Sequence, residues 1–167
     1  MRAGDRAAFD EMVRAYEPPI LKLVQRYVRV SEDAKDVAQR TFVRVFEHLD
    51  SYRGDSRFRT WLYRVAVNAA IDHARGAHHE RSVPLEDDAA FTNSLGTDRL
   101  VAAEVWRKVN ARLADLPARQ RLVVELRFFH DLSFDEIGAI VDSTEDAAKA
   151  NYHHGVKRLR SLLGPPK

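Results

Sequence analysis

Apolar residues recur along this chain with the period of an α-helix, and no segment shows the alternation expected of a strand. Pro18 with Pro19 should separate the first two helices, Ser31 should cap the third, and Gly54 marks the loop before the fourth. The pattern therefore predicts an all-α fold. The expected helices lie at about 5–16, 18–29, 32–50, 57–75, 100–114, 118–128, 133–141 and 144–163.

A central segment at 77–99 interrupts this pattern. It has no helical period, contains Pro84, and carries an acidic run at Glu86–Asp88. We expect a flexible acidic linker between a small helical domain at 1–76 and a second one at 100–167, each with a modest core of its own.

The charge distribution agrees with this division, although the net charge is only +2. Residues 1–75 carry 14 basic and 11 acidic groups, residues 76–100 carry 2 and 5, and residues 101–167 carry 11 and 9. Basic ends therefore flank an acidic middle.

Composition and motifs exclude several functions. The 167 residues include no cysteine, so disulfides, thiolate zinc sites and thiol redox sensing are excluded. Apolar runs are too short to span a membrane, and MRAGDRAAF lacks a signal-peptide core, so we expect a cytoplasmic protein without membrane insertion. Adjacent histidines such as His78 and His79 would diverge by about 100° on a helix, and no HExxH motif or phosphate loop accompanies them. No metal, cofactor or enzymatic activity is expected.

The predicted helix at 57–75 has two faces of different chemistry. The apolar face, which should be buried, consists of Phe58, Leu62, Val65, Ala66 and Ala69. The polar stripe consists of Arg57, Trp61, Arg64, Asn68, Asp72 and Arg75. Cations bind phosphates, an indole stacks on bases and an amide binds base edges, so the polar stripe indicates single-stranded nucleic acid. A solvated helix with a half-buried tryptophan is the alternative.

The C-terminal helices form a helix-turn-helix pattern. Ser133 and Glu136 have the spacing of a capping box, and Thr144 is the expected N-cap of the last helix. One face of that helix is apolar, and the opposite face carries Lys149, Ala150, His153, His154, Lys157 and Arg160. No acidic residue follows Lys149, which suits a helix laid against duplex DNA. A basic C-terminal helix of an ordinary bundle is the alternative.

A third surface is predicted on the helix at 32–50. Asp36, Gln39, Val43 and Phe46 lie away from its buried stripe and combine apolar side chains with a carboxylate and an amide. This mixture indicates a protein contact, and a solvated face is the alternative.

Three segments resemble bacterial RNA polymerase sigma factors of the extracytoplasmic-function (ECF) type, and together they cover almost the whole chain. SYRGDSRFRTWLYRVAVNAAIDH resembles the promoter-melting segment, and EDAKDVAQRTFVRVFEHL resembles the segment that grips the clamp helices of the largest polymerase subunit. LADLPARQRLVVELRFFHDLSFDEIGAIV and the basic helix after it resemble the module that reads the minus-thirty-five element. The resemblance implies a transcription initiation factor that binds core RNA polymerase, recognises a promoter and melts its DNA.

The resemblance and the helix faces described above together assign residues to each surface. Core polymerase binding falls on Asp36, Gln39, Val43 and Phe46. Contacts to the minus-ten DNA fall on Tyr52, Arg53, Arg57, Phe58, Trp61, Arg64, Asn68 and Arg75. Contacts to the minus-thirty-five DNA fall on Arg119, Arg121, Arg127, Thr144, Lys149, Ala150, Asn151, His153, His154, Lys157 and Arg160. Among these, Asn68 matches a position that contacts a non-template base, and the three arginines match phosphate partners.

The chain departs from the family pattern at several positions. Asp142 stands where glycine is common in the turn, Ser143 replaces an apolar residue, and Glu145–Ala147 replace a small residue, glycine and threonine. Aspartate accepts left-handed geometry better than most residues, so the turn should tolerate Asp142. Lys35 and Arg40 replace acidic residues that are frequent in the polymerase-binding segment.

The resemblance further implies a cognate anti-sigma factor, and a linker that enters the RNA channel of the polymerase, where its acidic run would imitate RNA. A solvated tether is the alternative for the linker. A second hypothesis for the whole chain is a helix-turn-helix regulator that binds duplex DNA without polymerase-dependent melting. That hypothesis leaves the polar stripe and the face with Asp36 without a role.

Overall fold

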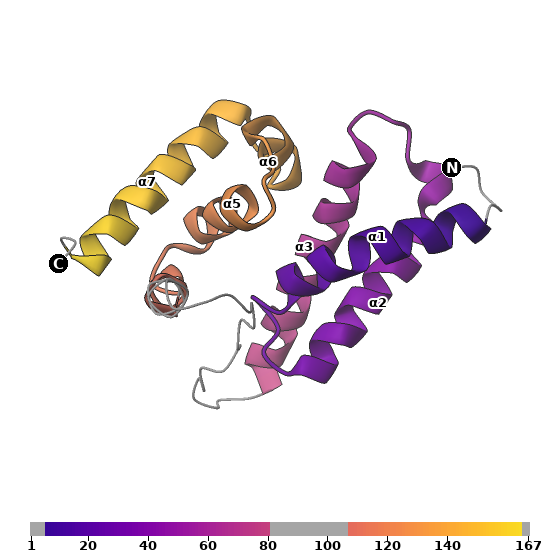
Figure 1. Cartoon of the computed structure of the whole chain (residues 1–167), viewed down its shortest axis with the longest axis horizontal. Helices are drawn as coiled ribbons and strands as arrows, with labels where there is room; N and C mark the ends of the chain where they lie inside the picture. The colour runs from indigo at the N-terminus through magenta and orange to yellow at the C-terminus, as the bar shows by residue number, and fades with distance from the viewer. Residues whose placement is uncertain (1–5, 81–106, 165–167) are drawn as a thin grey trace, which may run out of the picture. The chain divides into compact units, whose positions relative to one another are not determined.

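The computed structural model describes residues 6–80 and 107–164, and in these ranges the chain is helical and contains no strand (Figure 1). The helices are α1 (Arg6–Val24), α2 (Ser31–Glu47), the short 3-10 helix η1 (Leu49–Ser51), α3 (Phe58–Glu80), α5 (Ala118–Phe129), α6 (Phe134–Ile140) and α7 (Glu145–Leu163), and residues 107–113 are helical as well. The chain divides into two compact units, 1–89 and 90–167. The predicted all-α fold is confirmed.

In the first unit, α1, α2 and α3 pack against one another. The apolar stripes that helical period predicts supply the core, and the fully buried side chains include Ile20 and Leu23 of α1, Val45 of α2 and Leu62 of α3. Burying a side chain of this size contributes about 1.5–3 kcal/mol. The amphipathic pattern of each helix therefore determines which of its faces remain available for binding.

The predicted break at Pro18 and Pro19 is wrong, because α1 continues through both prolines as a single helix. A proline removes one N–H from the helical ladder and crowds the turn before it. The carbonyls that lose their partners belong to Arg14 and Ala15, and both residues are exposed, so water can hydrate these groups. Ile20 beyond the prolines is fully buried, and its packing favours continuation of the helix.

In the second unit, α7 packs against α5 and α6. Two buried glycines allow these approaches. A Cβ atom on Gly155 would lie 2.8 Å from Cγ2 of Val124 in α5, and one on Gly138 would lie 3.0 Å from the carbonyl oxygen of Ser143 in the turn. No sequence motif marks either glycine, so sequence analysis did not identify them.

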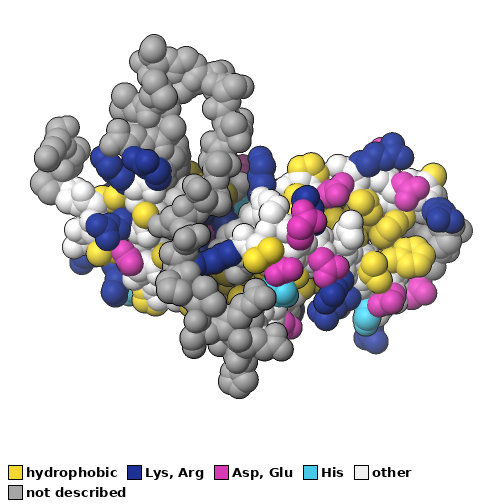
Figure 2. Space-filling model, turned by 90° about the horizontal axis from the view of Figure 1, so that it is seen from below, with side chains coloured by type: hydrophobic (Ala, Val, Ile, Leu, Met, Phe, Trp, Pro, Cys, Tyr) yellow, Lys and Arg dark blue, Asp and Glu magenta, His cyan; other side chains and the backbone are white. Residues whose placement is uncertain are grey.

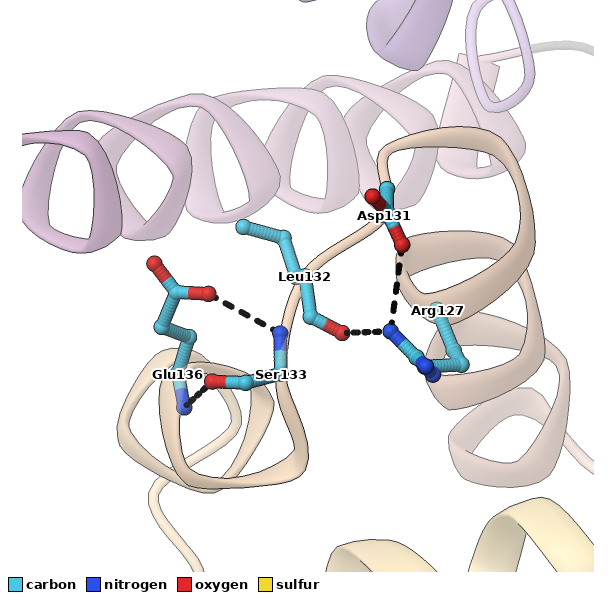
Figure 3. A network of polar contacts seen from close by, with 5 residues as sticks. All are labelled: Arg127, Asp131, Leu132, Ser133 and Glu136. Carbon is cyan, nitrogen blue, oxygen red and sulfur yellow. Dashed lines mark hydrogen bonds and ion pairs between the residues drawn. The ribbon is translucent and has the colours of Figure 1, made fainter.

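The helix-turn-helix motif forms as predicted. The hydroxyl of Ser133 accepts from the N–H of Glu136 at 3.2 Å, and the N–H of Ser133 donates to the Glu136 carboxylate at 2.9 Å, which completes the capping box (Figure 3). Asp142 has a φ of +52°, so the expected left-handed geometry is confirmed. Thr144 caps α7 by accepting from the N–H of Ala147 at 3.1 Å. Each cap contributes about 1 kcal/mol.

Helix α3 continues to Glu80 and so includes residues 77–80 of the segment predicted as a linker. The rest of that segment, with its acidic run at 86–88, lies outside the described residues, as does the beginning of the helix expected at 100–114. Within the described parts of the chain, no helix is long and apolar enough to cross a membrane. The same residues contain no cluster of side chains that would hold a metal ion.

Candidate nucleic-acid and protein interfaces

Helix α3 has a buried face and an exposed face, as its period predicts. Leu62, Ala66 and Ala69 are buried, whereas Phe58 and Val65 are buried only in part. Most of the polar stripe is exposed, namely Arg57 just before the helix and then Arg64, Asn68, Asp72 and Arg75. Cations and an amide therefore project together from one side of α3.

Three aromatic rings meet at the N-terminal end of α3, and we call Tyr52, Phe58 and Trp61 the aromatic cluster. The ring centroids of Tyr52 and Trp61 lie 5.2 Å apart with their planes at 30°, and Phe58 lies 5.8 Å from each of them. Tyr16 of α1 adds a fourth ring, 6.3 Å from Phe58. Trp61 is therefore half-buried against neighbours that hold its indole in place, a contact with Tyr52 that helical period alone does not reveal.

The loop between η1 and α3 places cations next to the aromatic cluster. Arg53 and Arg57 are exposed. Gly54 has a φ of +79°, a left-handed conformation that glycine adopts without strain. The hydroxyl of Tyr52 donates to the carbonyl of Ser56 and so closes the loop. Guanidinium groups beside aromatic rings form the combination that holds a single strand of nucleic acid.

An apolar groove of about 820 Å³ runs between α1 and α2. Val43 and Phe46 of α2 line it and are 55% and 54% exposed. The ring of Phe46 packs edge-on against Phe9 of α1, with 4.9 Å between centroids, and Val13 adds to the apolar wall. On the face drawn in Figure 2, hydrophobic side chains lie exposed among acidic and basic ones. Exposed apolar groups around a groove indicate a protein contact. The residues predicted from sequence lie on the α2 side of this groove, and the α1 side was not predicted because helical period describes one helix at a time.

Two ion pairs lie on the exposed surface of α2. The carboxylate of Asp36 is 2.7 Å from the guanidinium of Arg40, and the carboxylate of Glu32 is 2.9 Å from the ammonium of Lys35. The basic members of both pairs are the residues that depart from the family pattern. Exposed pairs of this kind contribute only about 0.3–0.5 kcal/mol, so Asp36 can exchange its partner at small cost.

The outer face of α7 is accessible, as predicted. Ala148, Gly155 and Leu159 are buried against the rest of the unit. The exposed residues of the predicted DNA-binding face are Ala150, His153, His154, Lys157 and Arg160. This face combines small, imidazole and cationic side chains, which suits close approach to a duplex.

Two side chains predicted to contact bases are held in place within α7. Nζ of Lys149 lies 2.8 Å from Oε1 of Glu145 and 3.9 Å from Oδ1 of Asp146. The hydrogen bond that Lys149 donates to Glu145 raises the pKa of Lys149, and the charges of Glu145 and Asp146 act in the same direction. Nδ2 of Asn151 donates to the carbonyl of Ala147 at 2.8 Å. Sequence analysis treated Glu145 only as a departure from the family pattern and did not foresee its contact with Lys149.

Arg127 of α5 bridges to the segment that leads into α6 (Figure 3). Its Nη1 donates to Oδ1 of Asp131 at 3.2 Å and to the carbonyl of Leu132 at 3.1 Å. The guanidinium also lies 5.4 Å from the ring centroid of Phe134. Leu132 immediately precedes the capping box, so Arg127 braces the entry to α6.

The other two arginines predicted to bind phosphates are also engaged inside the second unit. Nη2 of Arg119 donates to the carbonyl of Val141 at 3.0 Å, which ties α5 to the turn before α7. Nε of Arg121 donates to Oε1 of Glu125 at 3.0 Å, and the Glu125 side chain is 0% exposed. A buried carboxylate requires a paired cation, so Arg121 has a structural role that sequence analysis did not foresee.

Comparisons with known proteins match both units. Residues 12–80 match the Sigma-70 region 2 family, and residues 112–161 match the Sigma-70 region 4 family. The RNA polymerase sigma-H factor of Pseudomonas aeruginosa is 31% identical over 99% of this chain and 91% of its own length. The ECF RNA polymerase sigma factor SigW of Bacillus subtilis is 30% identical over 98% and 92%, and the ECF RNA polymerase sigma-E factor of Escherichia coli is 36% identical over 99% and 91%.

Two solved structures share the fold. The structure of CnrH in complex with the cytosolic domain of CnrY matches with a TM-score of 0.71 and 24% identity, covering 96% of this chain and 90% of the other. The sigma factor RpoE in complex with the anti-sigma factor NepR from Bartonella quintana matches with a TM-score of 0.73 and 21% identity, covering 93% and 96%.

Proposed function

The chain belongs to the ECF sigma factors, and from this premise we propose how its surfaces share the work of transcription initiation. As a member of this family it is an initiation factor that binds core RNA polymerase and directs promoter recognition and DNA melting. The family is not known to be enzymatic, and the chain contributes binding energy to the process. Its place of action is the cytoplasm, with RNA polymerase.

We assign capture of the melted minus-ten strand to α3 and the loop before it. The observation that carries this assignment is the exposed polar stripe beside the aromatic cluster. Trp61 offers a stacking surface worth about 1–3 kcal/mol per base, and the amide of Asn68 hydrogen-bonds a base edge. A base that is still stacked and paired in the duplex reaches neither group, so the surface favours the open strand. The full minus-ten surface comprises Tyr52, Arg53, Arg57, Phe58, Trp61, Arg64, Asn68 and Arg75.

Docking on core polymerase falls to the groove between α1 and α2. Its exposed apolar side chains, Val43 and Phe46, bury surface against the polymerase. Gln39, which also lines the groove, and Asp36, which is exposed about one turn earlier on α2, add polar contacts. The α1 wall of the groove, with Phe9, extends this surface beyond the residues predicted from sequence. We further propose that an anti-sigma factor covers the same groove until a signal releases it. An exposed apolar groove is typical of a protein-binding site, and this groove would otherwise be open whenever the chain is not bound to core polymerase.

Reading of the minus-thirty-five element falls to α7. Lys157 and Arg160 lie exposed and bind phosphates, whereas Lys149, Asn151 and His154 contact base edges. A lost phosphate contact weakens binding to all sequences alike, while a lost base contact changes preference at one position by about 1–3 kcal/mol. The remaining members of this surface are Thr144, which caps the helix, Ala150, whose small side chain permits close approach, His153, and Arg119, Arg121 and Arg127, whose guanidinium groups also brace the unit.

The competing hypothesis is a regulator that binds duplex DNA through the same helix-turn-helix. It explains α7 equally well. It gives no role to the aromatic cluster, to the exposed amide of Asn68 or to the groove on α2. Strand opening that depends on core polymerase separates the two functions, because a duplex-binding regulator supports no opening when core polymerase is its only partner.

Two substitutions in the polar stripe test the proposal. Trp61→Ala removes a stacking surface and Asn68→Ala removes a base-edge contact, so each variant should reduce opening of the promoter by about fivefold or more. Permanganate footprinting of the reconstituted holoenzyme measures opening as thymine reactivity near the start site. Binding of either variant to core polymerase should match wild type, since neither residue lines the groove between α1 and α2.

Asp72→Ala is the matched control for the stripe. Asp72 is exposed on the same side of α3 but carries a charge that repels phosphates, so its removal should leave opening undiminished. Trp61→Phe keeps an aromatic ring beside Tyr52 and should retain part of the opening that Trp61→Ala loses. Full thymine reactivity in both Trp61→Ala and Asn68→Ala holoenzymes would show that the strand is held elsewhere.

A further inference from the structure

The first two turns of α7 contain a carboxylate and an ammonium group in direct contact. Oε1 of Glu145 lies 2.8 Å from Nζ of Lys149, and the two side chains are 49% and 44% exposed. The hydroxyl of Thr144 accepts from the N–H of Ala147 and so supplies the N-cap of the helix. The Glu145 carboxylate is directed to Lys149, one turn further along the helix.

Asp146 provides an internal comparison. It carries the same charge in the same turn, but its Oδ1 lies 3.9 Å from Nζ of Lys149 and its side chain is 97% exposed. Both carboxylates interact favourably with the helix dipole. Dipole stabilisation therefore explains an acidic residue at either position. The short contact belongs to Glu145 because it lies four residues before Lys149 and has the longer side chain, whereas Asp146 lies three residues before it.

This contact places a hydrogen-bond acceptor beside a donor. Lysine carries its charge on a flexible four-carbon stem, and a hydrogen bond to Glu145 favours one position of Nζ over the others. In the major groove, guanine offers two adjacent acceptors, O6 and N7, which suit a lysine, and the paired cytosine offers its N4 amino group, which suits a carboxylate. Phosphates repel a carboxylate, so Glu145 fits the base edges and not the backbone.

We propose that Glu145 and Lys149 act as one reading unit that recognises a single G·C base pair in the upstream promoter element. Lys149 donates to guanine, while Glu145 accepts from cytosine and positions the lysine. This inference rests on the proposed function of α7, and it adds a specificity-determining residue that the family pattern does not contain.

Selection of promoter sequences by wild-type holoenzyme with a randomised upstream element first locates the preferred G·C pair. Competition binding then uses four duplexes that differ only at that pair. Wild type should prefer G·C by about tenfold or more, and both Glu145→Ala and Lys149→Ala should reduce the preference to about threefold or less. The double variant should lose no more than either single variant, because two members of one unit are not additive.

Asp146→Ala is the matched control. It removes the same charge from the same turn, so it should raise affinity for all four duplexes by a similar factor and leave the G·C preference intact. Both carboxylates are exposed and the Thr144 cap remains, so Glu145→Ala and Asp146→Ala are both expected to fold. Similar thermal midpoints for the two variants would verify this.

Three results would overturn the inference alone: a retained preference in Glu145→Ala, an equal loss in Asp146→Ala, or additive losses in the double variant. A wild-type holoenzyme that selects no upstream sequence at all would instead contradict the proposed function of α7, and the inference would fall with it.

Discussion

Glu125 is a carboxylate in the interior of the second unit, and its charge must be balanced there. Nε of Arg121, one turn earlier on α5, donates to it at 3.0 Å. The Arg121 side chain is only 27% exposed, so this pair is shielded from solvent far more than the pairs on α2. At the scale of single residues, a cation that matches a phosphate-binding position thus also carries part of the stability of the fold.

Arg121→Ala should lower the free energy of unfolding of the second unit by about 3 kcal/mol, because it removes the guanidinium that pairs with a buried carboxylate. Urea denaturation followed by circular dichroism measures this loss. Addition of Glu125→Gln to the same chain should recover part of it, since the side chain at 125 then carries no charge to bury.

Arg119→Ala is the control for this prediction. Arg119 is exposed and donates to a backbone carbonyl, so its replacement should cost about 1 kcal/mol or less. Equal urea midpoints for Arg119→Ala and Arg121→Ala would contradict a structural role for Arg121 and would leave phosphate binding as its main role.

At the scale of helices, the proposed reading of DNA by α7 requires its inner face to pack closely on α5. Gly155 makes this possible, because a Cβ atom there would lie 2.8 Å from Cγ2 of Val124, a stiff and buried side chain. This close packing restricts the movement of α7 relative to α5 and so keeps the exposed face of α7 in one orientation.

Gly155→Ala should destabilise the second unit by about 1 kcal/mol or more, since the overpacking of α5 exceeds the gain in helix propensity. Gly76→Ala offers a matched comparison in α3. Nothing lies within 4 Å of a Cβ atom there, so the same substitution should stabilise the first unit by about 0.5–1 kcal/mol. Thermal unfolding measures both changes, and a stabilising effect of Gly155→Ala would contradict the close approach of α7 to α5.

The exposed surface of α2 gives a prediction for docking. Asp36→Arg combined with Gln39→Ala should reduce recovery of holoenzyme by about tenfold or more in co-purification with core polymerase, because the exposed surface of α2 beside the groove exchanges a carboxylate for a cation and loses an amide. Stability should change little, since both residues are exposed.

Glu32→Arg is the matched control for docking. Glu32 lies on the same helix, is exposed, and pairs with Lys35 as Asp36 pairs with Arg40. Its reversal makes the same change of charge away from the groove and should leave holoenzyme recovery near that of wild type. A wild-type yield from the double variant, or an equal loss in Glu32→Arg, would refute the docking surface on α2.

Helical period and turn residues were enough to predict most elements of this chain, and the exceptions have physical causes. The capping box at Ser133 and the left-handed turn at Asp142 are local, so sequence reveals them. The course of α1 through Pro18 depends on burial of residues beyond it, and the contact of Trp61 with Tyr52 joins α3 to the preceding loop. Such contacts depend on packing between segments. The spacing of apolar residues along one helix gives no information about that packing.

At the scale of the whole molecule, two small helical units carry different tasks in initiation. In the proposed assignment, the first unit has two separate surfaces, a groove on α1 and α2 for protein and a stripe on α3 for melted DNA. The second unit would present the exposed face of α7 to duplex DNA. A factor organised in this way should act only together with core polymerase, because its DNA surfaces read both closed and opened parts of one promoter.

Run-off transcription on a library of promoters tests this account most directly. Core polymerase with the wild-type chain should produce discrete transcripts from a subset of the library, and core polymerase alone should produce none of them. The Trp61→Ala chain should bind core polymerase and yield few transcripts. Absence of any chain-dependent transcript, together with sequence-specific binding of the chain to duplex DNA without polymerase, would contradict the account.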